Sequence, residues 1–338
     1  MQLTTDDLML VTGATGLVGS HVVEEARKRE VPVRVLVRSG SDTSQLDEWG
    51  VEKVTGDMGV PASLKKAVEG VTVIVHCAAK VGDWGPVEEY RRINVDGLNN
   101  LLDAAQNNGT LKAFVHISSL GVYEARDHYG TDETEFPHVA GIDGYTLTKA
   151  ESELAVMKRV RDNALPATVL RPGFIYGPRD RTVLPRLLEK LKAGKVKYLG
   201  STDKLMNNTY VGNLVQAIFL AIENDACRRE VFNIRDDRLV SKREFMETIC
   251  QEAGYKPPPT KPVPLSVARG LASVLEKTYR LLGKKHAPIL SSARIKFLGL
   301  NLDFCIDKAK RELGYDPKTD FKQAMHETID WFQGQGLI

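Results

Sequence analysis

The sequence contains few cysteines, and they lack the paired spacing of metal-binding or redox motifs. Its four cysteines, Cys77, Cys227, Cys250 and Cys305, stand far apart, so we expect free thiols of the kind found in a reducing cytosol. Neither sign of charge is in excess, with 46 Lys and Arg against 44 Asp and Glu. Because the chain also has no basic stripe with interleaved aromatic residues, we do not expect it to bind nucleic acid.

Targeting, membrane and metal signals are also missing. No apolar run approaches the roughly 20 residues that a membrane-spanning helix needs, and Asp6 and Asp7 stand where a secretion signal has a basic head. The chain has no Gly-x-Ser-x-Gly motif, no His-Glu-x-x-His motif and no aspartate-rich metal loop. We therefore expect a cytoplasmic protein without a metal site, and a composition that is 42% hydrophobic and 27% charged is typical of a globular fold.

What the chain does contain begins with a glycine pattern behind an apolar run. The run from Leu8 to Thr12 is followed by Gly13, Gly16 and Gly19, and then by apolar residues at helical spacing. A strand, a tight turn and a helix in this order let the backbone approach a pyrophosphate at the helix N-terminus. The cofactor-binding residues expected in this turn are Gly13, Thr15, Gly16, Leu17 and Val18.

The end of the second predicted strand, Val31 to Val37, bears on which dinucleotide binds. Folds that prefer NAD carry an acidic residue there, which hydrogen-bonds the ribose 2′-hydroxyl. Here Arg38 and Ser39 follow the strand, and their guanidinium and hydroxyl groups suit a 2′-phosphate. We therefore predict NADP as the cofactor, with NAD as the alternative in which Arg38 is a solvated loop residue.

Three further strands are predicted at Val51 to Thr55, Val71 to Val75 and Ala113 to Ile117. Residues that follow parallel strands lie at the ligand edge of the sheet. Asp57, after the first of these strands, is placed to accept a hydrogen bond from the adenine amino group, and small residues after the second let a cofactor lie close to the backbone. The cofactor-binding residues predicted here are Asp57, Met58, Ala78, Ala79 and Lys80.

The loop from Lys80 to Pro86 is rich in glycine and has an aromatic residue at its centre. Because it follows the carboxyl end of a strand, it lies at the expected ligand crevice, and Asp83 and Trp84 are candidate substrate contacts. The alternative for Trp84 is that it anchors the loop to the core. On the next predicted helix, Glu88 to Gln106, we expect Asn94 to brace the strand end rather than take part in chemistry.

Tyr145 and Lys149 stand four residues apart at the start of a predicted helix, so their side chains share one helical face. A tyrosine hydroxyl, with a reference pKa of about 10, transfers protons near neutral pH only where a cation stabilises its phenolate. Lys149 is placed to be that cation. Ser118 and Ser119 end the strand before this helix, and strand alternation lets only one of the two face the crevice.

Taken in order, these motifs resemble the extended short-chain dehydrogenases/reductases of the NAD-dependent epimerase/dehydratase superfamily. The matching features are the glycine turn, Gly56-Asp57, His76 to Ala79, Ser119 before Val122-Tyr123, Tyr145 to Lys149, and Arg171 to Pro178. The resemblance implies that Ser119, rather than Ser118, holds the substrate oxygen and that Tyr145 transfers the proton during hydride transfer. It implies that Lys149 binds the nicotinamide ribose and lowers the pKa of the tyrosine.

A sixth strand is predicted at Thr168 to Leu170, and the same resemblance extends to the segment after it. Pro172 and Gly173 are implied to pass beside the nicotinamide carboxamide, and Tyr176 is a further candidate substrate contact. Glycine-rich Ala79 to Gly85, together with an additional apolar helix, makes the chain most similar to the 3β-hydroxysteroid dehydrogenase-like branch. Members of the family commonly dimerise through helices of the Rossmann face, so a homodimer is expected by analogy.

The predicted fold class is α/β, a doubly wound parallel-sheet Rossmann fold with a smaller, mostly helical C-terminal substrate domain. Residues 1–178 form the dinucleotide-binding domain, to which 211–235 return, and 179–210 and 236–338 form the substrate-binding domain. The apolar residues of 265–282 recur at three- and four-residue spacing, which predicts an amphipathic helix. This helix has three alternative roles: packing on the small domain, covering a substrate as a lid, or contacting a membrane surface peripherally.

These features imply an enzyme that transfers a hydride between NADP and a secondary alcohol or ketone. The small-molecule substrate is expected to be apolar, either sterol-like or 3-oxoacyl. The alternative is a nucleotide-sugar 4-epimerase with tightly bound NAD, which uses the same three catalytic residues. A non-catalytic redox sensor that binds NADP and a partner protein is a third hypothesis, and the presence of both Tyr145 and Lys149 argues against it.

Overall fold

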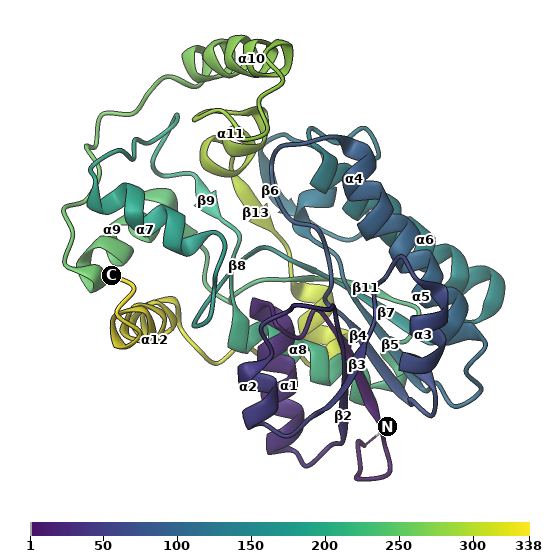
Figure 1. Ribbon diagram of the computed structural model, residues 1–338. Coiled ribbons are helices and arrows are strands. Elements are labelled where there is room, and N and C mark those ends of the chain that lie inside the picture. Colours follow the sequence, from purple (N-terminus) through teal and green to yellow (C-terminus); the bar gives the residue numbers. More distant parts are fainter. Residues whose placement is uncertain (1) are drawn as a thin grey trace.

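The computed structural model describes residues 2–338, except the side chain of Asn163, and its centre is a parallel sheet of seven strands (Figure 1). In spatial order the strands are β11 (Val231–Ile234), β7 (Ala167–Pro172), β5 (Ala113–Ile117), β4 (Val73–His76), β1 (Met9–Thr12), β2 (Val33–Val37) and β3 (Glu52–Thr55). Every neighbouring pair is parallel. The predicted doubly wound sheet is therefore confirmed.

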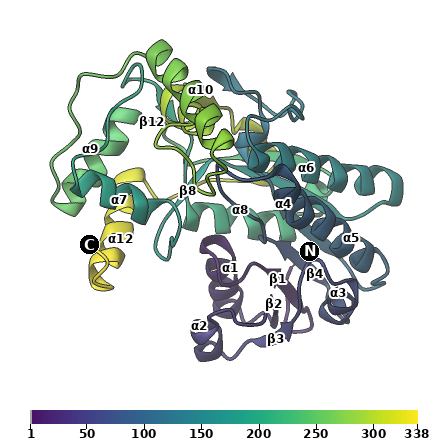
Figure 2. The ribbon, with the colours of Figure 1, turned by 45° about the horizontal axis from the view of Figure 1, so that its top comes forward.

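Helices cover both faces of this sheet, as Figures 1 and 2 show. One face carries α1 (Leu17–Lys28), α2 (Ser44–Glu48) and α8 (Val211–Glu223), and the other carries α3 (Pro61–Val68), α5 (Gly97–Gln106) and α6 (Gly144–Asn163). Successive strand residues alternate between the two cores: Val11, Val35 and Val75 face one, and Leu10, Leu36 and Ile74 face the other. Coverage on both faces explains why the central strands are continuously apolar.

The order of the strands reverses between β1 and β4. The chain builds outward from β1 through β2 to β3, and then returns to place β4, β5, β7 and β11 on the other side of β1. In the register of the two central strands, Thr12 pairs with His76. The glycine turn after β1 and the small residues after β4 therefore meet at the topological switch point, where ligands of such sheets bind.

A separate hydrophobic core lies towards the C-terminus. It is shared by α7 (Leu184–Lys192), α9 (Lys242–Ala253) and α12 (Phe321–Gly334), and includes Phe245 and Phe321. Three small two-stranded sheets accompany it: β8 (Phe174–Tyr176) with β10 (Asn208–Tyr210), β9 (Leu205–Met206) with β12 (Val240–Ser241), and β6 (His128–Thr131) with β13 (Leu302–Phe304). The domain boundaries given above stay a prediction.

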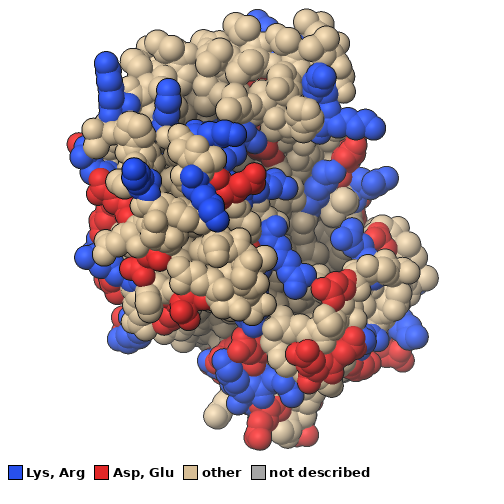
Figure 3. Space-filling view, turned by 60° about the vertical axis from the view of Figure 1, so that its left-hand side comes forward, with Lys and Arg blue, Asp and Glu red and all other residues tan. Residues whose placement is uncertain are grey.

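The predicted amphipathic helix is present as α10 (Leu265–Leu281), which packs against α11 (Ser292–Gly299) at the top of Figure 1. Ala268 and Ala272 are its two buried residues. The outward residues Val267, Leu271 and Val274 are each more than half exposed, at 58%, 51% and 62%. Figure 3 shows the top of the molecule as largely tan, with basic side chains around it. In the described part of the chain, no helix has the length and apolar character to cross a membrane.

Candidate active site

The turn between β1 and α1 needs a glycine at Gly13. Its φ is +71°, and a Cβ there would lie 2.8 Å from the backbone nitrogen of Ala78. The N-cap of α1, Gly16, makes no side-chain hydrogen bond to the first turn, and Thr15 and Gly16 are exposed. The N–H groups of Leu17 and Val18 are therefore available to an anion, and the turn fits a dinucleotide pyrophosphate.

The segment after β4 lies close beside this turn. The N–H of Ala78 donates to Thr12 Oγ1 over 3.3 Å, and that hydroxyl also bonds His76 Nδ1 at 2.8 Å. These contacts hold Ala78 and Ala79 against the glycine turn. Their methyl side chains leave space for a cofactor to approach the backbone, as the sequence predicts.

Asn94 fixes the end of that segment. The N–H of Lys80 donates to Asn94 Oδ1 at 2.7 Å, and Asn94 Nδ2 donates back to the Lys80 carbonyl at 3.1 Å. The helix predicted over 88–106 is interrupted here: α4 (Val87–Arg91) passes through a π-helical turn, η1 (Arg92–Asp96), before α5 begins. Such turns often occur at functional sites. The bracing role expected for Asn94 is confirmed.

The residues predicted to select the nucleotide lie at the ends of β2 and β3. Arg38 follows β2 directly, and its side chain is exposed. Asp57 is also exposed, and its Oδ1 accepts a hydrogen bond from Gly59 N at 2.8 Å. Met58 is buried, with its carbonyl bound by Asn100. Asp57 thus accepts a hydrogen bond within its own turn through one carboxylate oxygen, while the second oxygen is available to a further donor.

The two serines after β5 face opposite directions. Ser118 is buried, and its Oγ donates to Glu153 Oε2 at 2.6 Å. Ser119 is partly exposed, accepts a hydrogen bond from Gly121 N at 3.0 Å and interacts with the Tyr145 hydroxyl. The structure therefore agrees with the alternation argument and brings Ser119 to Tyr145.

Lys149 lies one turn along α6 from Tyr145, below the same crevice. It is 5% exposed, and its Nζ donates to the carbonyl of Ile117 at 2.6 Å. Burial raises the pKa of Tyr145 to about 12 and lowers the pKa of Lys149 to about 8. The expected lowering of the tyrosine pKa is therefore not produced by this arrangement alone, because desolvation dominates and the ammonium group is directed at a backbone carbonyl.

A buried ion pair supports the loop that carries Ser119. Glu153 and Arg171 are 2% and 3% exposed, and Arg171 Nε lies 3.0 and 3.1 Å from the two carboxylate oxygens. Arg171 Nη1 donates to the Tyr123 hydroxyl, and Ser118 donates to the same carboxylate. The pair connects β7 and α6 to Ser118 and Tyr123, which lie on either side of Ser119 in this loop. These contacts give Arg171 a structural role.

The loop after β4 contacts the C-terminal segment. Asp83 accepts a hydrogen bond from Arg294 Nε at 2.7 Å, and Trp84 Nε1 donates to the Lys284 carbonyl at 2.9 Å. The Trp84 ring meets Tyr279 edge to face, with centroids 6.3 Å apart. Trp84 thus anchors the loop to α10 and the residues after it, rather than to the core. Substrate contact by Asp83 and Trp84 stays a prediction.

Pro172 and Gly173 lie where β7 leaves the sheet. A Cβ at Gly173 would lie 1.8 Å from the carbonyl oxygen of Asn207, so only glycine allows this approach. Tyr176 differs from the prediction that it contacts substrate. Its side chain is completely buried in the C-terminal core, and its hydroxyl donates to Asp236 at 3.0 Å. Tyr176 therefore has a structural role in the C-terminal core.

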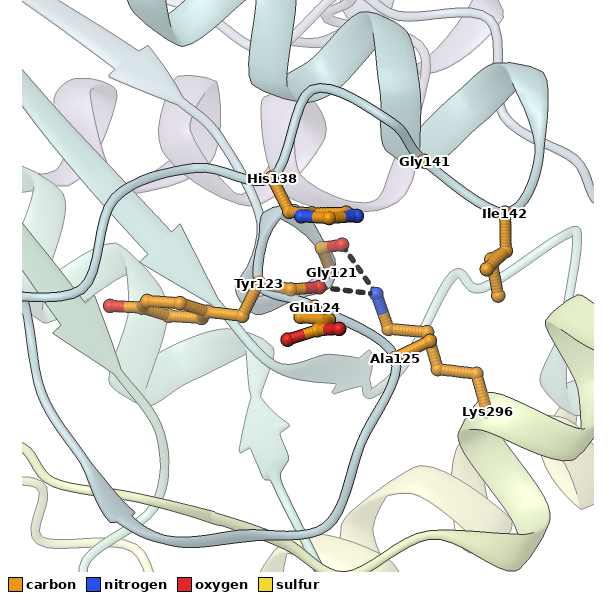
Figure 4. Close-up of a pocket in the computed structure, with 8 residues that line it drawn as sticks. All are labelled: Gly121, Tyr123, Glu124, Ala125, His138, Gly141, Ile142 and Lys296. Atoms are coloured by element: carbon orange, nitrogen blue, oxygen red, sulfur yellow. Dashed lines mark hydrogen bonds between the residues drawn. The ribbon is translucent and has the colours of Figure 1, made fainter.

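A pocket of about 250 Å³ begins two residues after Ser119 and is lined by the eight residues labelled in Figure 4. They come from the loop after β5, the segment before α6, and α11. Lys296 of α11 extends into it and donates to the carbonyls of Gly121, at 2.7 Å, and Tyr123, at 2.8 Å. His138 lies across the pocket from Glu124. Sequence reasoning missed Lys296 and His138, since no local pattern marks them.

A second, smaller pocket lies beside the glycine turn. Its lining includes Thr15, Asp42 and Arg181, and Arg181 Nη1 lies 3.7 Å from an Asp42 carboxylate oxygen. No pattern in the sequence marks Arg181. Arg181 follows the predicted dinucleotide-binding domain in the sequence. Its guanidinium group lies beside the glycine turn, where a pyrophosphate fits.

His116 is a residue of β5 whose imidazole ring is buried without hydrogen-bond partners among the described residues. It stacks on His76 with ring centroids 5.5 Å apart. Burial lowers the pKa of His116 well below its usual value, so the ring is neutral. No cluster of three or more possible metal ligands occurs among the described side chains.

This chain is similar to known proteins over most of its length. A family model described as NAD dependent epimerase/dehydratase family matches residues 9–234. The sterol-4-alpha-carboxylate 3-dehydrogenase (decarboxylating) of Candida albicans is 32% identical over 96% of this chain and 97% of its own length. The 2-alkyl-3-oxoalkanoate reductase of Shewanella oneidensis is 29% identical, covering 93% and 84%. The crystal structure of gox2253 has a TM-score of 0.83 at 31% identity, covering 98% and 99%.

Proposed function

The chain belongs to the NAD-dependent epimerase/dehydratase family, and we propose that it is an NADP-dependent oxidoreductase acting on an apolar, sterol-like or 3-oxoacyl, secondary alcohol or ketone. The observation that carries this proposal is the contact between Ser119 and Tyr145 at the end of β5, between the dinucleotide crevice and the pocket. The names of the relatives, a sterol dehydrogenase and an oxoalkanoate reductase, support the same substrate class.

Ser119, Tyr145 and Lys149 have different proposed roles in the reaction. Ser119 hydrogen-bonds the substrate oxygen and orients it, and Tyr145 takes the hydroxyl proton while the adjacent carbon loses its hydride. In the direction of reduction, Tyr145 returns that proton to the oxygen. The nicotinamide, when bound, accepts or supplies the hydride. Lys149 binds the nicotinamide ribose, and its charge, together with that of the oxidised ring, opposes the effect of burial on the Tyr145 pKa.

The proposal is tested by nicotinamide absorbance in the presence of a 3β-hydroxysteroid, a 3-hydroxyacyl compound and UDP-glucose. Turnover with either of the first two is expected, with net formation of reduced cofactor. Conversion of UDP-glucose to UDP-galactose without a net absorbance change would instead establish the epimerase alternative and overturn the proposal.

The preference for NADP is assigned to Arg38, which is exposed at the carboxyl end of β2. Arg38→Asp is expected to lower kcat/KM for NADP by about 10- to 100-fold, the worth of a charge-assisted hydrogen bond, and to improve the use of NAD. Arg161→Asp is a matched control, because Arg161 is 73% exposed on α6. A wild-type enzyme that already prefers NAD would refute this assignment.

The outer face of α10 is assigned to peripheral contact with an anionic membrane. Val267, Leu271 and Val274 are exposed on one side of the helix, and exposed Lys277 and Lys284 lie towards its C-terminal end. Apolar and basic side chains in this arrangement bind membrane interfaces.

The double substitution Leu271→Glu and Val274→Glu is expected to abolish cosedimentation with phosphatidylserine vesicles. Turnover of a water-soluble substrate should not change, because both side chains are exposed and neither lines the pocket. If vesicle binding persists, or if the wild type does not bind, the contact does not occur; a fall in turnover would favour the lid alternative.

A further inference from the structure

Lys296 has hydrogen-bonding capacity that the protein leaves unused. An ammonium group carries three N–H donors, and Lys296 directs two of them to the carbonyls of Gly121 and Tyr123. In the described part of the chain, no carboxylate oxygen lies within 4 Å of Lys296 Nζ. In Figure 4 its Nζ ends among the pocket-lining residues. One donor is thus left for a ligand in the pocket.

The acidic groups near Lys296 balance its positive charge only in part. Asp143 is the acidic group that acts on it, but the Asp143 carboxylate caps α6 by accepting from Thr146 N at 2.8 Å. Glu124 also lines the pocket, and it lies 3.7 Å from Arg126 with its side chain 57% exposed. His138 faces the same space. Burial lowers the pKa of Lys296 to about 8, and an anion in the pocket would complete its pairing.

The position of Lys296 relates it directly to the reacting centre. Gly121 accepts a hydrogen bond from Lys296 through its carbonyl and donates one through its N–H to Ser119 Oγ, at 2.7 and 3.0 Å. One residue and two hydrogen bonds therefore separate the ammonium group from the hydroxyl that holds the substrate oxygen. In a 3-hydroxy acid, four covalent bonds join the hydroxyl oxygen to a carboxylate oxygen, so the acid carries its two polar groups only a few bonds apart.

We propose that Lys296 binds a substrate carboxylate and that the natural substrate is a 3-hydroxy or 3-oxo acid. This inference rests on the oxidoreductase function proposed above, and what it adds is the residue that would hold the acidic group of such a substrate. The Ser119 hydroxyl then positions the oxygen that reacts, while Lys296 fixes the carboxylate two carbons away. An ester or a simple alcohol of the same chain length lacks the second contact.

The test compares 3-hydroxydecanoate with its methyl ester and with 2-nonanol, in wild type and in Lys296→Met. In Lys296→Met, kcat/KM for the acid is expected to fall by about 10- to 100-fold, mainly through KM, as for the loss of a charged hydrogen bond. The ester and the alcohol should change by less than about threefold. Lys296→Arg keeps the charge and should retain selectivity for the acid.

Lys242→Met is the matched control. Lys242 is also buried, and its Nζ donates to the Phe297 carbonyl, but it does not line the pocket. Its loss should leave the ratio of acid to ester unchanged, whatever its effect on stability. Equal changes for acid and ester in Lys296→Met, or a wild type that treats the two alike, would overturn the inference and leave the oxidoreductase function standing.

Two further readouts do not depend on that ratio. In wild type, KM for the acid should rise above a pH of about 8, where Lys296 loses its proton, and this rise should vanish in Lys296→Arg. Calorimetry with decanoate and 1-decanol tests the site without turnover. If decanoate binds through Lys296 but no probe is oxidised, the proposed function fails and the carboxylate site stands; decanoate binding that ignores Lys296→Met overturns the site.

Discussion

Tyr145→Phe is expected to lower kcat by about a hundredfold to ten-thousandfold, the range that a positioned proton-transfer group contributes. Phenylalanine keeps the ring and removes only the hydroxyl that interacts with Ser119. Cofactor affinity should change by no more than a few fold, because the glycine turn and Lys149 are untouched. Turnover is followed by nicotinamide absorbance, and affinity by quenching of protein fluorescence. A loss of cofactor binding that matches the loss of turnover would show that Tyr145 holds the cofactor instead.

Tyr176→Phe provides the matched control for this variant. Tyr176 is buried, and its hydroxyl is one of several groups that bind Asp236, together with Asn208, Asn213 and the backbone of Tyr210. Its removal should cost about 1 kcal/mol of stability, the net worth of one hydrogen bond, and leave kcat unchanged. A specific rise in KM for one substrate would restore Tyr176 as a substrate contact.

Local patterns in the sequence were sufficient to predict the sheet and to single out Ser119, Tyr145 and Lys149 as candidate catalytic residues. Two of these patterns lie within short segments: the glycine spacing after Thr12, and the four-residue spacing of Tyr145 and Lys149. The alternation of side chains along a strand distinguishes Ser118 from Ser119. The structure places these groups at one edge because parallel strands present their carboxyl ends together. Short segments of sequence are thus sufficient to predict a dinucleotide-binding crevice.

The remaining features depend on contacts between distant segments. Lys296 reaches the carbonyl of Gly121 across 175 residues of sequence, and Arg294 reaches Asp83 across 211. No period or spacing encodes such a meeting. The Tyr145 pKa is a similar case, because a sequence shows the neighbouring cation but not the burial that opposes it. Tyr176 was assigned from its motif, whereas packing with Phe245 and Phe321 decides its direction.

The buried pair of Glu153 and Arg171 is expected to carry the largest effect on stability. Arg171→Met should lower the free energy of unfolding by about 3 to 5 kcal/mol, because it leaves a carboxylate buried without its cation. Ser118 and Tyr123 also bond to this pair, so the loop that carries Ser119 should loosen and turnover should fall. Urea unfolding followed by tryptophan fluorescence measures the first effect.

The double variant Glu153→Leu with Arg171→Met distinguishes an unpaired charge from lost packing. If the cost of Arg171→Met comes from the isolated carboxylate, removing that carboxylate as well should recover part of the lost stability, and the double variant should be more stable than Arg171→Met alone. Turnover should not recover with it, because Ser118 and Tyr123 still lack the partners that orient the catalytic loop. Additive losses in stability would show that the two side chains contribute by packing rather than as an ion pair.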